Sequence, residues 1–289
     1  MTTVSGAFAI SAPFAAGVLL DAYGIDTGVR ILYAIMAVAY ATGATINLLF
    51  IKETERPEVE KVEVSRLPVI FKDAYTGIPA LLGRFPRALK GLAVIVIIGF
   101  MSNAVAGPFW VVYAKDQIGL SAAQWGFVLL IESALGNLVR IPAGFLSDRF
   151  GRTRFIFVAL LVSGSCIPLF VFASTLGQVM AIRCVVAVTM AFFGPSCGAL
   201  LADTVPRDIR GRAMAAIGRG SVMIGAASGG TGGPGVGFLT IIPLALASLA
   251  GGLLYEWNSA SPWAFVLAVA VIALVLTALF VRDPKKAEV

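Results

Sequence analysis

Long apolar stretches alternate with short polar ones along the chain. A helix needs about 20 mostly apolar residues to cross a bilayer, so each long stretch is a candidate transmembrane helix. In lipid every backbone N–H and C=O must be paired within the segment, which favours helices. The pattern predicts eight transmembrane helices, at residues 3–22, 30–51, 91–113, 122–143, 155–174, 178–201, 236–256 and 262–281.

Two segments depart from this pattern. Residues 52–90 are polar, and in their later part Arg84, Arg87 and Lys90 stand among apolar residues. This part fits either a flexible linker or an amphipathic helix on the membrane surface. Residues 213–228 are apolar but too short to span a bilayer. The run that follows is rich in glycine, which has a low helix propensity, so we do not expect the helix to continue through it. We expect a helix at the membrane surface over residues 213–228.

Composition supports a membrane protein. Apolar residues make up 58% of the chain and charged residues 13%, whereas about 25% of a typical soluble domain is charged. The chain has no histidine, which excludes Ser–His triads and histidine-ligated metal sites. Its three cysteines lie in apolar runs without paired spacing and resemble buried hydrophobes. We therefore expect an all-α integral membrane protein with no metal and no cofactor.

The positions of the basic residues predict the topology. Seventeen of the 22 Lys and Arg residues fall within residues 52–90, 144–154, 202–212 and 282–289, which eight spans place on one side. Basic loops stay in the cytoplasm. Both ends of the last six helices are therefore expected on the cytoplasmic side of the plasma membrane, and the net charge of +6 indicates topology rather than nucleic-acid binding.

Aromatic residues gather at the opposite ends of the spans. They fit an interfacial aromatic belt in contact with membrane lipids, although packing between helices is an equally good explanation for any single one. The residues are Trp110, Tyr113, Trp125, Tyr255, Trp257 and Trp263.

The chain contains an internal repeat. Residues 17–23 (GVLLDAY) resemble residues 251–257 (GGLLYEW), and the helices that follow end in the similar strings FIKE and FVRD. The first two predicted helices therefore look like copies of the last two, and many transporters are built from such duplicated halves. The repeat leads us to expect four further helices ahead of the first one, supplied by a longer chain or by a partner chain.

One motif resembles a known family. Residues 144–154 read GFLSDRFGRTR, which resembles the G-x-x-x-D-R-x-G-R signature loop of the major facilitator superfamily. A second family-like stretch, DTVPRDIRGR, covers residues 203–212. The resemblance implies twelve helices in two six-helix halves, of which this chain would hold helices five to twelve. Residues 1–52 would end the N-terminal half, 53–90 would be a cytoplasmic linker, 91–282 the C-terminal half with a glycine-rich insertion at 213–235, and 283–289 a cytoplasmic tail.

The signature stretch is a candidate gate. Gly144 would let helices approach closely, and Gly151 would permit a tight turn. Asp148 can bind a neighbouring arginine, and such a cluster would favour one packing of the halves over another. A loop that serves only to set topology is the alternative. The candidate gating residues are Gly144, Asp148, Arg149, Gly151, Arg152 and Arg154.

Glu132 lies near the middle of the predicted span 122–143. A charge at a helix centre costs roughly 2.5–3.5 kcal/mol on insertion scales, which makes it a functional candidate. We expect Glu132 and Arg140 to serve proton coupling, or else to form a pair that only fixes helix packing. Ser133 and Asn137 share a polar stripe with Arg140 and are candidate substrate contacts. Arg183, near an outer helix end, is expected to snorkel to the interface.

The family resemblance adds Asn103 to the candidate substrate contacts, since it implies that residues 91–113 line a central cavity. The predicted function is a secondary active transporter that moves a small solute by alternating access, with protons as the expected coupling ion. The alternative is a truncated, non-transporting membrane protein or accessory subunit. An enzyme is not expected, because the G-x-S-x-G string at residues 194–198 has no histidine partner.

Overall fold

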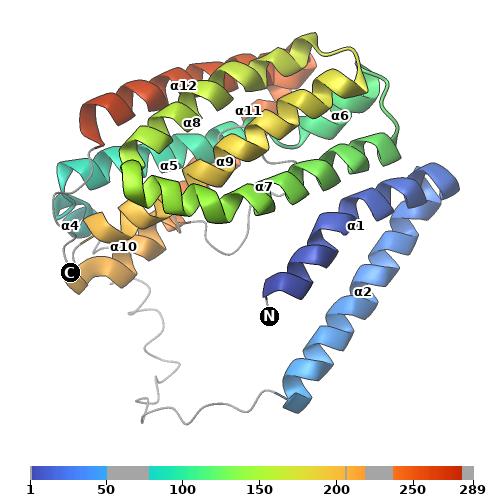
Figure 1. Cartoon of the computed structure of the whole chain (residues 1–289), viewed down its shortest axis with the longest axis horizontal. Helices are drawn as coiled ribbons and strands as arrows, with labels where there is room; N and C mark the ends of the chain where they lie inside the picture. The colour runs from blue at the N-terminus through green and yellow to red at the C-terminus, as the bar shows by residue number, and fades with distance from the viewer. Residues whose placement is uncertain (1, 51–77, 206, 219–236, 282–289) are drawn as a thin grey trace.

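A computed structural model describes residues 2–50, 78–205, 207–218 and 237–281 (Figure 1). Helices joined by short turns dominate this part of the chain. Two short 3₁₀ segments, η2 (Ile167–Phe172) and η3 (Arg207–Ile209), supplement the α-helices. The α-helices are α1 (Thr2–Tyr23), α2 (Ile25–Phe50), α4 (Ile78–Gly83), α5 (Arg87–Ala106), α6 (Phe109–Asp116), α7 (Ala122–Phe150), α8 (Arg152–Cys166), α9 (Leu176–Thr204), α10 (Arg210–Ile217), α11 (Phe238–Trp257) and α12 (Ser261–Phe280).

The structure confirms the predicted all-α membrane protein, and seven of the eight predicted spans correspond to helical segments that could cross a membrane. Within the described residues, seven helical segments are long and apolar enough to cross a membrane, and Ile10–Tyr23 of α1 forms a shorter apolar helix. Two of the seven consist of consecutive elements, because α5 runs on into α6 and α8 into η2. The chain is therefore an all-α, multi-pass membrane protein.

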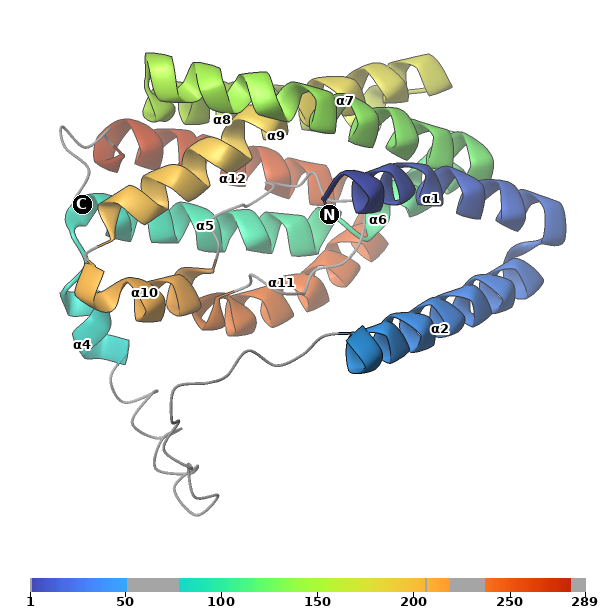
Figure 2. The same cartoon turned by 60° about the horizontal axis from the view of Figure 1, so that its bottom comes forward.

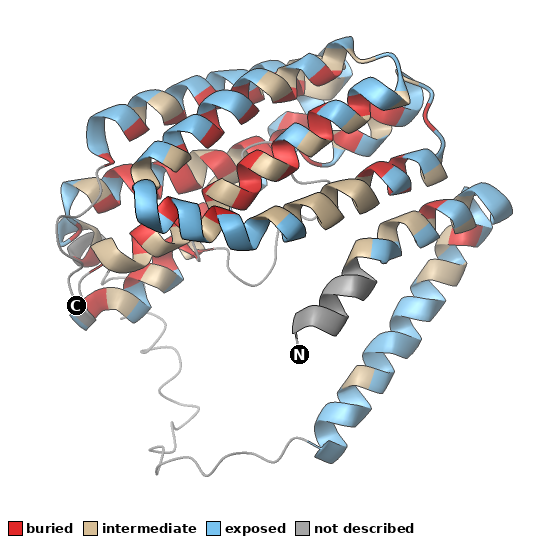
Figure 3. Ribbon diagram, viewed as in Figure 1, coloured by how far each residue is buried: buried red, intermediate tan, exposed pale blue. Residues whose placement is uncertain are grey.

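Six long helices form a bundle, and α1 and α2 form a hairpin beside it (Figures 1 and 2). In the bundle α5 packs against α11 and α12, α9 packs against α7 and α8, and α8 packs against α12. The hairpin is attached through α1, which packs along α7, whereas α2 packs on α1. Figure 3 shows that buried residues concentrate in the bundle and that α2 is largely exposed.

The two ends of the bundle differ in chemistry. One end holds α4, α10 and the C-terminal ends of α7, α9 and α12, together with many arginines, and is called the basic end below. The opposite end holds an aromatic cluster made of Trp110, Tyr113, Trp125, Phe170 and Trp263, and is called the aromatic end.

The aromatic cluster corrects the expectation of an interfacial belt. All five of its residues are buried, and their ring centroids lie 4.3–6.5 Å apart. Large rings in these offset and edge-to-face arrangements stabilise the core more than isolated rings at a surface. The belt prediction is therefore wrong for its four members of this cluster, whereas Trp257 is 82% exposed and remains available to the interface.

Two boundary predictions also need correction. The bundle begins before residue 91, since α4 and the start of α5 bury Leu81, Phe85 and Leu89 in the core instead of lying on a surface. The expected surface helix at 213–228 begins earlier, as α10, and buries Ala213, Ala216 and Ile217. Residues 51–77, 219–236 and 282–289, which include most of the linker, most of the insertion and the tail, lie outside the described residues.

Helices α1 and α7 pack closely at the aromatic end. A Cβ atom added to Gly126 of α7 would lie 2.5 Å from the carbonyl oxygen of Pro13 in α1. The Asp21 carboxylate of α1 accepts hydrogen bonds from the Ser121 Oγ (2.7 Å) and from the Ala122 and Ala123 N–H groups (3.0 and 2.9 Å). Asp21 thus supplements Ser121 in capping the first turn of α7. These contacts fix the hairpin on the bundle.

We expect Gly126→Val to loosen the hairpin from the bundle. The added side chain would press on α1 backbone, and overpacking of this kind costs about 1–3 kcal/mol. Disulfide crosslinking between Cys residues introduced at Phe14 and Phe127, whose ring centroids lie 5.9 Å apart, would report the contact and should fall. Gly43→Val on α2 is the control, because a Cβ there meets no described atom within 4 Å. Equal crosslinking in both variants would refute this account of the interface.

Candidate functional site

A pocket of about 490 Å³ lies between α7 and α9. The α7 wall carries polar groups at intervals of three and four residues, which places them on one face of the helix. The α9 wall is apolar. The lining residues are Glu132, Ser133, Gly136, Asn137 and Arg140 from α7, and Ala187, Met190, Ala191, Gly194 and Pro195 from α9.

One residue of this pocket wall, Glu132, belongs to a buried ion pair. The Arg183 guanidinium of α9 contacts Glu132 Oε2 through Nε at 2.8 Å and through Nη2 at 2.5 Å. Only 1% of the Arg183 side chain and 12% of the Glu132 side chain are exposed. The guanidinium also lies over the Trp110 and Trp125 rings, 4.5 and 5.8 Å from their centroids. The Glu132 charge is therefore balanced by a cation held in the aromatic cluster.

This pair changes two expectations. Arg183 does not snorkel to the interface but is buried, because a carboxylate and two indole rings surround its charge. The partner of Glu132 is Arg183, whereas Arg140 lies eight residues away, or about 12 Å along α7, and is exposed. The sequence around Glu132 could not reveal this partner, because the pairing depends on the relative position of α7 and α9 along their axes.

Two of the three candidate substrate contacts line this pocket and the third does not. Ser133 and Asn137 line the pocket, as the polar stripe predicted. The Asn137 Nδ2 donates a hydrogen bond to the Ser133 carbonyl at 2.8 Å, which holds the amide against the helix. Asn103 lies inside the bundle on α5, 7% exposed, and does not line this pocket.

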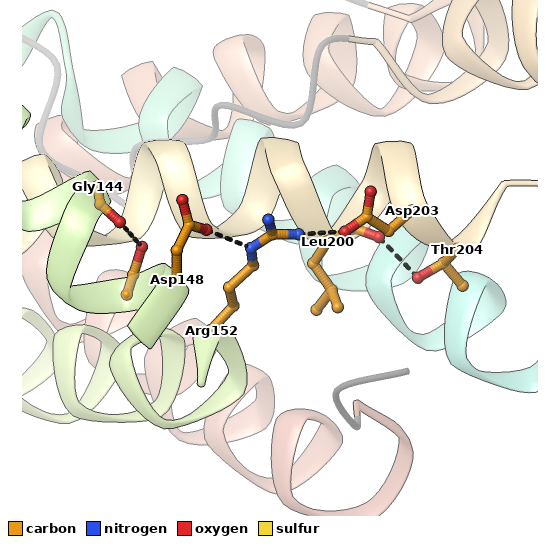
Figure 4. A network of polar contacts seen from close by, with 7 residues as sticks. Gly144, Asp148, Arg152, Leu200, Asp203 and Thr204 are labelled. Atoms are coloured by element: carbon orange, nitrogen blue, oxygen red, sulfur yellow. Dashed lines mark hydrogen bonds and ion pairs between the residues drawn. The ribbon is translucent and has the colours of Figure 1, made fainter. Parts of the chain in front are cut away.

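A second polar site joins three helices at the basic end (Figure 4). The Arg152 Nε, at the start of α8, donates to Asp148 Oδ1 of α7 at 2.9 Å. The Arg152 Nη1 donates to the carboxylate of Asp203 on α9. Figure 4 shows the guanidinium lying between the two carboxylates. We call Asp148, Arg152 and Asp203 the ionic cluster.

The signature stretch is a helix end rather than an open loop. Helix α7 continues through Phe150, and the chain turns only at Gly151, whose φ of +98° disfavours other residues. Gly144 does not mediate a close approach, since a Cβ there meets no described atom within 4 Å. Of the three candidate arginines, Arg152 binds Asp148, whereas the Arg149 guanidinium lies over the Phe150 ring.

Asp203 is a member of the ionic cluster that the candidate list omitted. It is the first residue of the second family-like stretch, residues 203–212. Pairing the arginines of the first stretch with the acidic residues of the second would have identified it. Asp208 of the same stretch forms an exposed ion pair with Arg84, which follows α4. Both stretches thus contribute ion pairs at the basic end.

Sequence comparisons support the family resemblance. The family model described as Major Facilitator Superfamily matches residues 92–289. An uncharacterized MFS-type transporter, YqjV, of Bacillus subtilis is 28% identical over 114 residues, which are 39% of this chain and 28% of that protein. Multidrug resistance protein 1 of the same organism is 27% identical over 175 residues, 59% of this chain and 39% of that protein.

A third relative is a Na⁺, Li⁺, K⁺/H⁺ antiporter of Planococcus maritimus, 28% identical over 108 residues, which are 36% of this chain and 25% of that protein. The matched part of the chain therefore spans well under half the length of each relative. The names of these relatives indicate transport or drug resistance and not catalysis, in agreement with the expectation that the chain is not an enzyme. Since the family model covers more than half of its residues, the chain belongs to the major facilitator superfamily.

Proposed function

We propose that the chain forms part of a secondary active transporter of the plasma membrane that moves a small solute by alternating access. The observation that carries this proposal is the pocket between α7 and α9, where Glu132, in the interior of the long helix α7, lies beside a buried arginine. A carboxylate is retained at such a depth only at a cost, which favours a functional role. The relatives named as a multidrug resistance protein and a cation/proton antiporter support the transporter class.

Glu132 is the proposed proton-coupling residue. A proton on its carboxylate would remove the charge that holds Arg183, so protonation would weaken the 2.5–2.8 Å ion pair. Arg183 would stay over Trp110 and Trp125, while the pocket wall beside Ser133 and Asn137 would be free to bind solute. Arg140, at the exposed end of the pocket, would then attract or repel charged solutes.

The ionic cluster is the proposed gate. Arg152 ties the ends of α7 and α9 to the start of α8, so the basic end of the bundle would stay in one arrangement while the cluster is intact. The contact between α1 and α7 lies at the other end of the pocket and would act as the pivot. Opening then needs the ionic cluster to break, as expected of a two-state device. By the rule that basic loops stay inside, the basic end would face the cytoplasm.

Proton movement in sealed vesicles tests this function. The wild-type chain would be reconstituted into vesicles that enclose the pH-sensitive dye pyranine, which reports the internal pH. Addition of Na⁺ or ethidium outside should then produce a solute-dependent proton flux. Glu132→Gln should lower that flux to the level of empty vesicles, because an amide cannot take up and release the coupled proton. Glu256→Gln, which removes an exposed carboxylate at the end of α11, is the matched control.

Two results would count against the proposal. A wild-type flux that Glu132→Gln leaves unchanged would remove Glu132 from proton coupling. A wild-type chain that inserts normally and gives no flux above empty vesicles for either solute would favour the non-transporting, accessory reading.

A further inference from the structure

A groove of about 290 Å³ runs between the start of α5 and the end of α12, at the basic end of the bundle. One end of the groove is cationic and the remainder is apolar. Its lining residues are Arg87, Lys90, Gly91, Val94, Leu276 and Phe280. It shares no lining residue with the pocket at Glu132.

Helix packing builds the groove. Arg87, Lys90 and Val94 are three and four residues apart on α5, so they line one face of that helix. At Gly91 the two helices touch, because a Cβ there would lie 2.6 Å from the Phe280 Cβ. Val94 and Phe280 are each 44% exposed, so the apolar walls open outward from the bundle toward the region that lipid occupies around these spans.

The charge of the groove is one-sided. Arg87 and Lys90 are both exposed, and among the described residues no carboxylate lines the groove. The nearby Arg84 differs, because it forms an ion pair with Asp208. A second groove on the other side of the last α12 turns repeats the pattern, with Arg154 beside Phe157, Thr277 and Val281. Cations therefore flank the end of α12 where the apolar span gives way to polar sequence.

We infer that the groove between α5 and α12 is a binding site for an anionic phospholipid of the phosphatidylglycerol class. Its phosphate would lie between Arg87 and Lys90, since charged donors form the strongest hydrogen bonds to phosphate oxygens. One acyl chain would lie along Val94, Leu276 and Phe280. An inorganic phosphate would satisfy the two cations but would leave the apolar walls unused, which is why we assign a lipid. This inference does not depend on the proposed transport function.

Native mass spectrometry of the purified chain in a neutral detergent tests the site. We expect wild type to retain phosphatidylglycerol in preference to phosphatidylcholine. The double substitution Arg87→Gln with Lys90→Gln should weaken phosphatidylglycerol binding about tenfold or more, since two charge-assisted contacts are lost. Arg87→Lys with Lys90→Arg keeps both charges and should retain binding, which separates loss of the site from loss of the fold.

Two further measurements distinguish lipid binding in this groove from nonspecific binding to surface charge. Arg212→Gln removes an exposed cation of α10 that lines none of these grooves, and it should bind phosphatidylglycerol as wild type does. Millimolar inorganic phosphate should not displace the lipid. Equal losses in Arg212→Gln and in the double variant would overturn the inference, as would displacement of the lipid by inorganic phosphate.

Discussion

Substitution of Arg183 by Met should destabilise the bundle by about 3–5 kcal/mol. Removing one partner of a buried ion pair leaves the other charge without compensation, and such losses fall in this range. The Glu132 side chain is only 12% exposed, so water would replace the lost guanidinium poorly. The stack on Trp110, 4.5 Å from the guanidinium, would be lost as well. The free energy of unfolding in mixed micelles, followed by tryptophan fluorescence, measures the effect.

A double substitution separates charge from packing. Glu132→Gln combined with Arg183→Met removes both charges and should recover much of the lost stability, because the desolvation penalty disappears with them. Arg140→Met is the matched control, since Arg140 is exposed at the pocket rim and surface changes usually stay within about 0.5 kcal/mol. If Arg183→Met were as stable as Arg140→Met, the buried pair could not be the interaction that fixes α9 on α7.

Substitution of Arg152 by Gln should open the basic end of the protein. The change removes both ion pairs of the ionic cluster, to Asp148 and to Asp203. Since 61% of the Asp148 side chain is exposed, solvent screens part of this energy. We therefore expect a loss of about 1–2 kcal/mol, which shifts a two-state equilibrium about tenfold. The labelling rate of a cysteine at Asn137, probed from the basic end with an impermeant maleimide, should rise accordingly.

The neighbouring arginine provides the control for this experiment. Arg149→Gln removes the same charge from the same helix end, but the Arg149 guanidinium lies over the Phe150 ring and not between the two carboxylates. In the Arg149→Gln variant, the labelling rate of the cysteine at Asn137 should stay within about twofold of wild type, in line with the small effects of most surface substitutions. Equal rates in the two variants would show that net charge, and not the ionic cluster, controls access to the pocket.

The spans were predictable because each has a local cause. Apolar length alone identifies segments such as α9 and α12, since lipid admits no alternative to a helix. The polar face of α7 was equally readable, because Ser133 and Asn137 follow helical spacing within one segment. The family resemblance located Asp148 and Arg152, two of the three residues in the ionic cluster.

What sequence reasoning missed depends on contacts between helices. The partner of Glu132 could not be chosen locally, since Arg183 lies 51 residues away on another helix. Trp110 and Trp263 stand at span ends, where a belt and a buried cluster look alike in sequence, and only their packing with Phe170 decides between the two. Gly144 has the right residue type for a close contact between helices, but a Cβ there would meet no described atom within 4 Å.

Two-sided access to the pocket is the most direct test of the proposed transport mechanism. A cysteine would be placed at Asn137 in a chain whose three native cysteines are replaced by Ala, and sealed vesicles of both orientations would be labelled with an impermeant maleimide. Alternating access predicts labelling from both sides, in a ratio that changes when a pH gradient is imposed and that does not change in Glu132→Gln. Labelling from one side only, whatever the gradient, would contradict the account.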